Sequence, residues 1–219
     1  IAYSSIGHMG YALAGISTGT NQGIQSSITY ISIYLFMNLA FFACLFMLRR
    51  DEKYFENIED LSGLSKNHPI LSFSFLIVLF SLAGIPPLVG FFAKFYIFTA
   101  VIEQSMYSLA IIGLLSTVIA AFYYLRIIKV IYFDPEKEKF EKNHNIGLRI
   151  SLAVSTIFIL FYFIYPSPLI EIIEKLQDVD GKLGYYNLAP IVEKTFNIMG
   201  LTKYSSVFSS ESEALQGMS

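Results

Sequence analysis

The sequence predicts an all-α fold, a polytopic integral membrane helix bundle of about five transmembrane segments with one discontinuous helix (70–84 / 88–102). The composition supports it, because 54% of the residues are hydrophobic and the 15% that are charged gather between long apolar runs. That pattern excludes an ordinary soluble domain. The length of the runs also fits, because a membrane core takes about 20 helical residues and lipid forces backbone groups to pair within each segment.

Five apolar runs define the expected helices, at about 1–18, 24–48, 70–102, 106–133 and 147–166. The first begins in mid-pattern, so we expect the chain to be a fragment or one piece of a split subunit. Pro166 and Pro168 close the last run. The single Cys44 lies in an apolar stretch, which excludes a disulfide within this chain and indicates a small packing residue.

The third run is too long for one straight span, and Gly84-Ile85-Pro86-Pro87 interrupts it. Proline removes a backbone donor and clashes with the preceding turn, so we expect the helix to stop there and restart. Lys94, the one side chain of the run that is charged at neutral pH, follows in the second half. Because an ammonium at that depth costs about 3 kcal/mol on insertion scales, another interaction or a function must offset it.

The basic residues predict one orientation for the bundle. Ten of the fifteen lie in or beside two loops that share a side if the segments alternate: Arg49, Arg50, Lys53, Lys66, Arg126, Lys129, Lys137, Lys139, Lys142 and Arg149. The loop from Gly19 to Ser26 has none. The positive-inside rule places the two basic loops in the cytoplasm or its organelle equivalent.

Residues 171–219 differ in character from the membrane domain expected over 1–170. They are predicted to form a polar, amphipathic and partly disordered tail. Within it, Tyr185 to Leu201 is predicted as a surface helix, and the Ser-rich last fifteen residues as disordered.

Lys94 is the strongest functional candidate, because an intramembrane charge is functional by default. The competing interpretation is a lysine that snorkels to the headgroups. Nine residues separate it from Glu103, and that distance, about 13 Å of helix, is too long for easy snorkelling. The break at Gly84, Pro86 and Pro87 frees carbonyl and amide groups beside the lysine, an arrangement typical of transporter binding sites.

His8 and one face of the second helix are further candidates. Histidine has an ordinary pKa of about 6.5, which suits a proton relay, but a neutral histidine bonded to a neighbouring helix by one ring nitrogen fits equally well. Tyr30, Tyr34 and Asn38 recur at a spacing of four and share one helix face. They could line ordered water, although interhelical hydrogen bonding that holds the bundle is the preferred interpretation.

Other aromatic and charged residues are interpreted as structural. The pair Tyr123-Tyr124, followed by Arg126 and Lys129, is typical of an anchor at the membrane interface. His68 is expected to be exposed at a helix start, and His144 to lie in a polar loop. The sequence contains no Walker loop, dinucleotide fingerprint, catalytic triad or metal-ligand spacing, and nothing in it suggests nucleic-acid binding.

Two motifs resemble the antiporter-like membrane subunits of respiratory complex I, the NADH–quinone oxidoreductase. They are Ala2-Tyr3-Ser4-Ser5-Ile6-Gly7-His8-Met9-Gly10-Tyr11 and Ser81-Leu82-Ala83-Gly84-Ile85-Pro86-Pro87-Leu88-Val89-Gly90-Phe91-Phe92-Ala93-Lys94-Phe95-Tyr96. The longer motif is most similar to the N branch of that family, whose mitochondrial counterpart is subunit 2. The resemblance covers about residues 1–170.

This resemblance implies the C-terminal part of a fourteen-helix subunit with two discontinuous helices in inverted repeats. Lys94 would then be the terminal lysine of a hydrophilic axis, near the proton exit. His8 would correspond to a histidine found in several of these subunits. The first discontinuous helix, a glutamate–lysine pair and a central lysine would all lie upstream of Ile1.

The implied function is proton translocation coupled to quinone reduction, in a bacterial plasma membrane or a mitochondrial inner membrane. NADH, FMN, iron–sulfur clusters and quinone are expected in other subunits, with no cofactor, metal or catalytic centre in this chain. The expected partners are the lipid bilayer, other membrane-arm subunits and the missing N-terminal half. Two alternatives stay open: a subunit of a multisubunit cation/proton antiporter, and a structural membrane-arm subunit with no active ion path.

Overall fold

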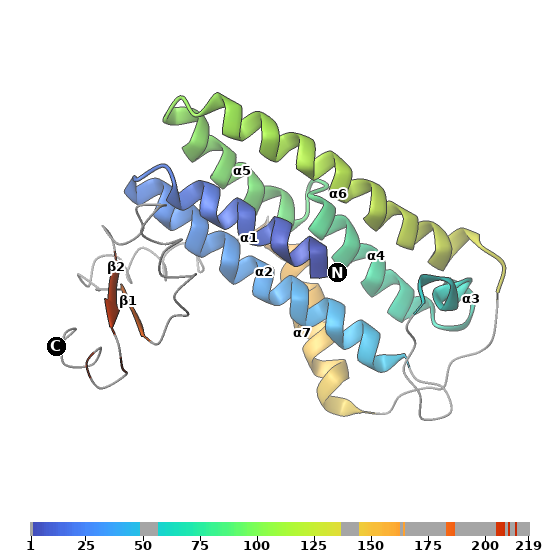
Figure 1. The fold of residues 1–219 in the computed structure, drawn as a ribbon. Coiled ribbons are helices and arrows are strands. Elements are labelled where there is room, and N and C mark those ends of the chain that lie inside the picture. Colours follow the sequence, from blue (N-terminus) through green and yellow to red (C-terminus); the bar gives the residue numbers. More distant parts are fainter. Residues whose placement is uncertain are drawn as a thin grey trace.

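The predicted membrane helix bundle is confirmed in a computed structural model that describes residues 2–48, 57–136, 145–162, 164, 183–186, 205–208, 210 and 213. Figure 1 shows its five helical segments: α1 (Ala2–Ile16), α2 (Asn21–Met47), the pair α4 (Pro69–Ala83) and α5 (Val89–Glu103), α6 (Tyr107–Phe133) and α7 (Ile146–Phe161). Helices α2 and α6 have 27 residues each and are long and apolar enough to cross a membrane. Helices α4 and α7 are shorter apolar helices.

The interrupted helix is present where it was predicted. Helix α4 ends at Ala83 and α5 begins at Val89, and the two halves follow one another along the length of α6 (Figure 1). Helix α2 lies at the centre of the bundle, because it packs against α1, α4, α5 and α7. The fully buried side chains that it contributes include Ile33 and Met37.

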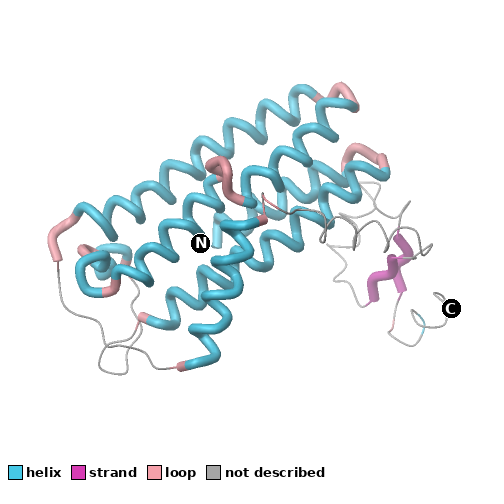
Figure 2. Tube along the Cα trace, turned by 180° about the vertical axis from the view of Figure 1, so that it is seen from behind, coloured by secondary structure: helices cyan, strands magenta, loops and turns pink. Residues whose placement is uncertain are grey.

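Both basic loops start and finish at one end of the bundle, as alternating segments require. The 3-10 helix η1 (Ile58–Leu61) and the short helix α3 (Leu64–Asn67) connect α2 to α4 at that end. There the Gly63 N–H donates to the carbonyl of Val130 near the end of α6 (3.1 Å), and the Ser62 hydroxyl donates to the carbonyl of Pro135 (2.7 Å). Figure 2 shows the same end from behind, with the tight turns at the other end.

Two helix boundaries differ from the predicted ones for local reasons. Helix α2 starts at Asn21, three residues early, because the Thr20 hydroxyl caps it by accepting a hydrogen bond from the Gly23 N–H (3.1 Å). Helix α7 ends at Phe161, five residues early. Pro166 cannot donate to the carbonyl four residues before it and disfavours helix at the residue before it, so the helix stops short of the proline.

The surface helix predicted from Tyr185 is wrong where the structure describes it. Tyr185 and Tyr186 lie in β1 (Leu183–Tyr186), which pairs in parallel with β2 (Ser205–Phe208). β-Strands favour aromatic residues, so a tyrosine pair is at least as compatible with a strand as with a helix. The remainder of the predicted helix, most of the predicted disordered end, and His144 lie outside the described residues.

Candidate functional site

The C-terminal end of α4 is organised around Gly84. Gly84 has the left-handed φ of +85°, and its N–H donates to the carbonyl of Ser81 (2.9 Å) while the Ile85 N–H donates to that of Phe80 (3.0 Å). These two bonds form a Schellman motif, which needs a residue such as glycine at the left-handed position. Since the last four carbonyls of a helix lack partners within it, those of Leu82 and Ala83 remain to be satisfied.

Lys94 supplies the two missing donors. Its ammonium nitrogen Nζ donates to the carbonyls of Leu82 (3.0 Å) and Ala83 (3.2 Å), and only 5% of the residue is exposed. The positive charge also lies at the negative end of the α4 dipole, where a cation is stabilised. On another side, Nζ lies 5.3 Å from the centre of the Tyr11 ring, within cation–π range. The charge is therefore compensated by dipoles rather than by a carboxylate among the described residues.

The two halves of the interrupted helix approach closely at Gly90. The Gly90 N–H, near the start of α5, donates to the Ser81 hydroxyl of α4 (3.1 Å). A Cβ atom at Gly90 would lie 1.9 Å from the carbonyl oxygen of Ser81, so only glycine fits there. This contact fixes where Lys94, one turn further along α5, meets the end of α4.

His8 is the centre of a second cluster, formed by α1, α2 and α6. It is 3% exposed, with Nδ1 2.7 Å from the Tyr30 hydroxyl and Nε2 3.1 Å from the Tyr124 hydroxyl. Tyr124 also bonds Ser4, and the Tyr34 ring stacks on the imidazole at a centroid distance of 4.5 Å. Both ring nitrogens are therefore bonded, to hydroxyl groups on two different helices, α2 and α6.

One cavity of about 190 Å³ connects the two clusters. His8, Lys94, Tyr11, Ser4 and Ser116 are among the residues that line it. A water molecule occupies roughly 30 Å³ in the liquid, so this polar-edged space can hold several. The contacts on α6 run from Gly113 to Tyr124, on either side of the middle of that helix, and place the cavity beside its central part.

Tyr11 closes the cavity between Lys94 and α6. Its hydroxyl is 2.6 Å from the Thr117 hydroxyl and 2.9 Å from that of Ser116, and it donates to the carbonyl of Gly113 (3.2 Å). Its place in the site is not predicted by the sequence. The available signal was its position three residues after His8, which puts both side chains on one face of a helix.

The remaining predicted residues have different environments. Tyr34 donates to the Ser5 hydroxyl (2.9 Å), whereas Asn38 is half-buried and makes no hydrogen bond to these clusters within the described part of the chain. The interpretation of Tyr124 as an interface anchor is wrong, because it is fully buried against His8. Arg126 and Lys129 do lie in exposed ion pairs, with Glu59 (3.8 Å) and Asp134 (3.4 Å).

The described residues contain no group of three or more His, Cys, Asp or Glu side chains that could hold a metal ion. His68 lies outside both clusters and lines a separate pocket at the loop end of the bundle. The arrangement at the break offers a buried cation, hydroxyl groups and an imidazole around a small cavity. These are groups that bind and exchange protons.

Comparison with known proteins gives a consistent set of similarities. Residues 1–120 match the family described as NADH:quinone oxidoreductase/Mrp antiporter, TM. The chain is 74% identical over 177 residues to NADH-quinone oxidoreductase subunit N of Pelagibacter ubique, with 81% of this chain and 38% of the relative covered. It is 49% identical over 170 residues to subunit N of Parvibaculum lavamentivorans, with 78% and 35% covered. The chain thus spans less than two-fifths of the length of these relatives.

Solved structures show the same fold. A chain of respiratory complex I from Thermus thermophilus with bound aureothin superposes with a TM-score of 0.63 at 27% identity, and the match covers 78% of this chain and 38% of that one. A chain of the Mrp complex from Dietzia sp. DQ12-45-1b superposes with a TM-score of 0.60 at 20% identity, covering 76% and 39%.

Proposed function

Since the chain belongs to the NADH:quinone oxidoreductase/Mrp antiporter transmembrane family, we propose that the full-length subunit translocates protons across the membrane as part of an NADH:quinone oxidoreductase. The names of the most similar curated relatives favour this assignment over the Mrp antiporter. The relatives compared above are bacterial proteins, which favours a bacterial plasma membrane over a mitochondrial one.

The buried ammonium of Lys94 at the end of α4 is the observation that supports the proposal most strongly. If α4 continued without a break, its carbonyls would bond within the helix and an apolar residue could replace the cation. Here the helix is broken, and its last carbonyls accept hydrogen bonds from Lys94 instead. A lysine held by dipoles alone can lose and regain its proton without leaving an unpaired carboxylate behind. We therefore assign Lys94 as a proton-binding group of the path.

His8 is the second group that we assign to the path. Its two bonded nitrogens join the hydroxyls of Tyr30 and Tyr124, so a proton accepted at one nitrogen can be released at the other. Water in the shared cavity would connect the imidazole to Lys94. Tyr34 packs on the ring and positions it, while we assign Asn38 no direct role.

Other parts of the complex would supply the rest of the activity. The oxidation of NADH and the reduction of quinone, with flavin and iron–sulfur chemistry, belong in this proposal to other subunits. The partners of this chain would be the N-terminal half of the same subunit and neighbouring membrane-arm subunits. We also propose a membrane domain over 1–170 followed by a separate tail, and the alignments, 170 to 177 residues long out of 219, agree with a domain of that length.

Proteoliposomes that contain the complete complex test this function. Lys94→Ala in the full-length subunit should lower proton uptake per NADH oxidised, with quinone reductase activity falling alongside. Lys129→Ala removes an exposed lysine of the same chain and should leave both rates near wild type. Unchanged pumping in Lys94→Ala, in a complex shown to be fully assembled, would overturn the role of Lys94.

The structural alternative gives a distinct result. If this chain only scaffolds the membrane arm, substitutions of Lys94 and His8 should lower the yield of assembled complex while leaving pumping per assembled complex unchanged. The antiporter alternative would instead appear as cation/proton exchange without any electron transfer. Measuring assembly, NADH oxidation and proton flux on the same preparation separates the three.

A further inference from the structure

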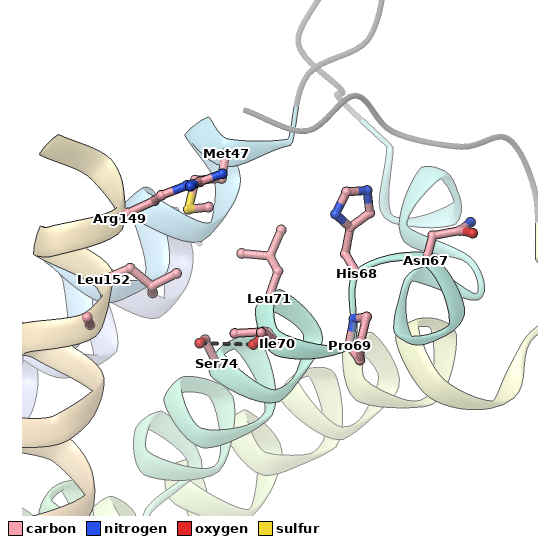
Figure 3. Close-up of a pocket in the computed structure, with 10 residues that line it drawn as sticks. Met47, Asn67, His68, Pro69, Ile70, Leu71, Ser74, Arg149 and Leu152 are labelled. Atoms are coloured by element: carbon pink, nitrogen blue, oxygen red, sulfur yellow. Dashed lines mark hydrogen bonds between the residues drawn. The ribbon is translucent and has the colours of Figure 1, made fainter. Parts of the chain in front are cut away.

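Aromatic side chains line the cavity that holds the Lys94 ammonium. Three tyrosines are among its lining residues, Tyr3, Tyr11 and Tyr123. The separate pocket at the loop end of the bundle, of about 560 Å³, has neither phenylalanine nor tyrosine among the ten described residues that line it (Figure 3). Tyr11 is the tyrosine whose ring lies against the lysine nitrogen, and it is 6% exposed, so the two groups meet away from solvent.

The Tyr11 ring is held at its hydroxyl end and at its side. Its hydroxyl bonds the hydroxyls of Thr117 (2.6 Å) and Ser116 (2.9 Å) on α6. The Phe98 ring packs against it in an edge-to-face arrangement, with a centroid distance of 5.9 Å and an interplanar angle of 79°. Packing alone needs no hydroxyl, whereas this one finds partners on a neighbouring helix. The contacts with α6 therefore set where the ring face meets Lys94.

The ring is also the neighbour of the one ammonium donor that the helix end leaves over. An ammonium group has three N–H donors, and two of those of Lys94 go to the carbonyls of Leu82 and Ala83. The third has the Tyr11 ring and the cavity as its described neighbours. A neutral amine keeps two N–H donors, so it can keep both carbonyl bonds. It loses the attraction of a ring face for a cation.

We propose that Tyr11 is a positioning residue of the proton path, and that its ring, held by the hydroxyl contacts with α6, favours the charged form of Lys94. Since Lys94 exchanges protons in the proposed function, on which this role rests, the third N–H is the one whose proton passes to water in the cavity. The nitrogen lone pair left behind would face a ring whose own face is negative. A desolvated cation–π contact therefore changes the ratio of charged to neutral lysine by about tenfold.

Ring fluorination tests the attraction while nearly preserving the packing. Proton uptake is measured in proteoliposomes with the complete complex, for Tyr11→Phe and for phenylalanine analogues at the same position with one, two or three ring fluorines. Fluorine withdraws electron density from the ring face, so the attraction for a cation weakens with each atom. Proton uptake per NADH oxidised should fall stepwise along the series, by about tenfold in all. The same series at Phe158, which packs on Phe36 (4.3 Å) and lies outside the cavity lining, should be flat.

Thr117→Val tests the hydroxyl contact while leaving Tyr11 in place, and so decides the question if Tyr11→Phe fails to assemble. It should lower proton uptake by about threefold, the size expected for one neutral hydrogen bond. The double variant with Tyr11→Phe should pump no less than Tyr11→Phe alone, because both remove the same bond. Thr99→Val is the matched control and should be silent. Thr99 donates to the carbonyl four residues before it (2.9 Å), as Thr117 does (3.0 Å), but bonds no tyrosine among the described residues.

A flat fluorine series at Tyr11 would overturn the proposal, and so would equal falls at Tyr11 and Phe158 or complete loss of pumping in Tyr11→Phe. Equal pumping in Thr117→Val and Thr99→Val, or additive losses in the double variant, would overturn the contact with α6. Failure of this role is distinguishable from failure of the proposed function. Normal pumping in Lys94→Ala refutes the function, whereas lost pumping in Lys94→Ala with a flat fluorine series refutes the role of Tyr11 alone.

Discussion

Gly90→Ala should separate the two halves of the interrupted helix while leaving every ionisable group in place. The new Cβ atom would lie 1.9 Å from the carbonyl oxygen and 2.7 Å from the carbonyl carbon of Ser81. Both of these are backbone atoms of α4, so no side-chain rotation relieves the contact. Because real Cβ atoms essentially never come closer than 3.0 Å, the start of α5 must move by about 1 Å in compensation.

That displacement is large compared with the tolerance of the lysine contacts. Lys94 Nζ lies 3.0 and 3.2 Å from its two carbonyls, and hydrogen bonds weaken beyond about 3.2 Å. Overpacking of this kind costs about 1–3 kcal/mol, and loss of the bond between the Gly90 N–H and the Ser81 hydroxyl adds about 1 kcal/mol. We therefore expect the free energy of unfolding to fall by about 2–4 kcal/mol.

Thermal unfolding of the full-length protein in detergent measures the loss of stability. Proton uptake by proteoliposomes measures the effect of the displaced lysine contacts on pumping. We expect a lower melting temperature together with reduced pumping, resembling Lys94→Ala although the lysine is present. Gly10→Ala is the matched control, because a Cβ there meets nothing within 4 Å, and a helical alanine is favoured over glycine by about 0.5–1 kcal/mol. Native stability and native pumping in Gly90→Ala would refute the packing argument.

Two further substitutions test the interior of the bundle. Tyr124→Phe removes the hydroxyl that bonds His8, so it should lower the free energy of unfolding by about 1–2 kcal/mol in thermal denaturation, whereas Tyr107→Phe, at the exposed start of α6, should be silent. Ser72 is fully buried, and its hydroxyl finds no hydrogen-bond partner among the described residues. Ser72→Ala should therefore be neutral or stabilising, while Ser74→Ala, which removes a bond to Ile70, should not stabilise; a clear loss in Ser72→Ala would reveal a hidden partner.

The interrupted helix could be predicted from the sequence because its signals are local. Proline and glycine act on the backbone within one turn, so Gly84, Pro86 and Pro87 locate the break to within two residues. The burial of Lys94 could also be predicted from its position, because it lies within an apolar run and far from both membrane interfaces. A capped helix end can be predicted by the same local reasoning, because a residue such as Thr20 is of a type that caps the start of a helix.

The partners of Lys94 and His8 could not be predicted, because they depend on how the helices pack. Tyr124 is more than a hundred residues from His8, and its sequence context, two residues before Arg126, is that of an interface anchor. Hydropathy cannot distinguish a tyrosine that faces the lipid boundary from one that faces another helix. The groups that accept hydrogen bonds from Lys94 are backbone carbonyls. Every residue has one, so the residue types do not reveal which carbonyls bind the lysine.

The bonding of Lys94 also has a consequence for how the protein is made. Helices α4 and α5 have 15 residues each, about 22 Å, which is shorter than a membrane core of about 30 Å. Neither half is a sufficient insertion signal, and a lysine in the second raises its insertion free energy by about 3 kcal/mol. Its acceptors are already synthesised when it emerges, because Ala83 precedes it by 11 residues. We therefore expect both halves to enter the bilayer as one unit.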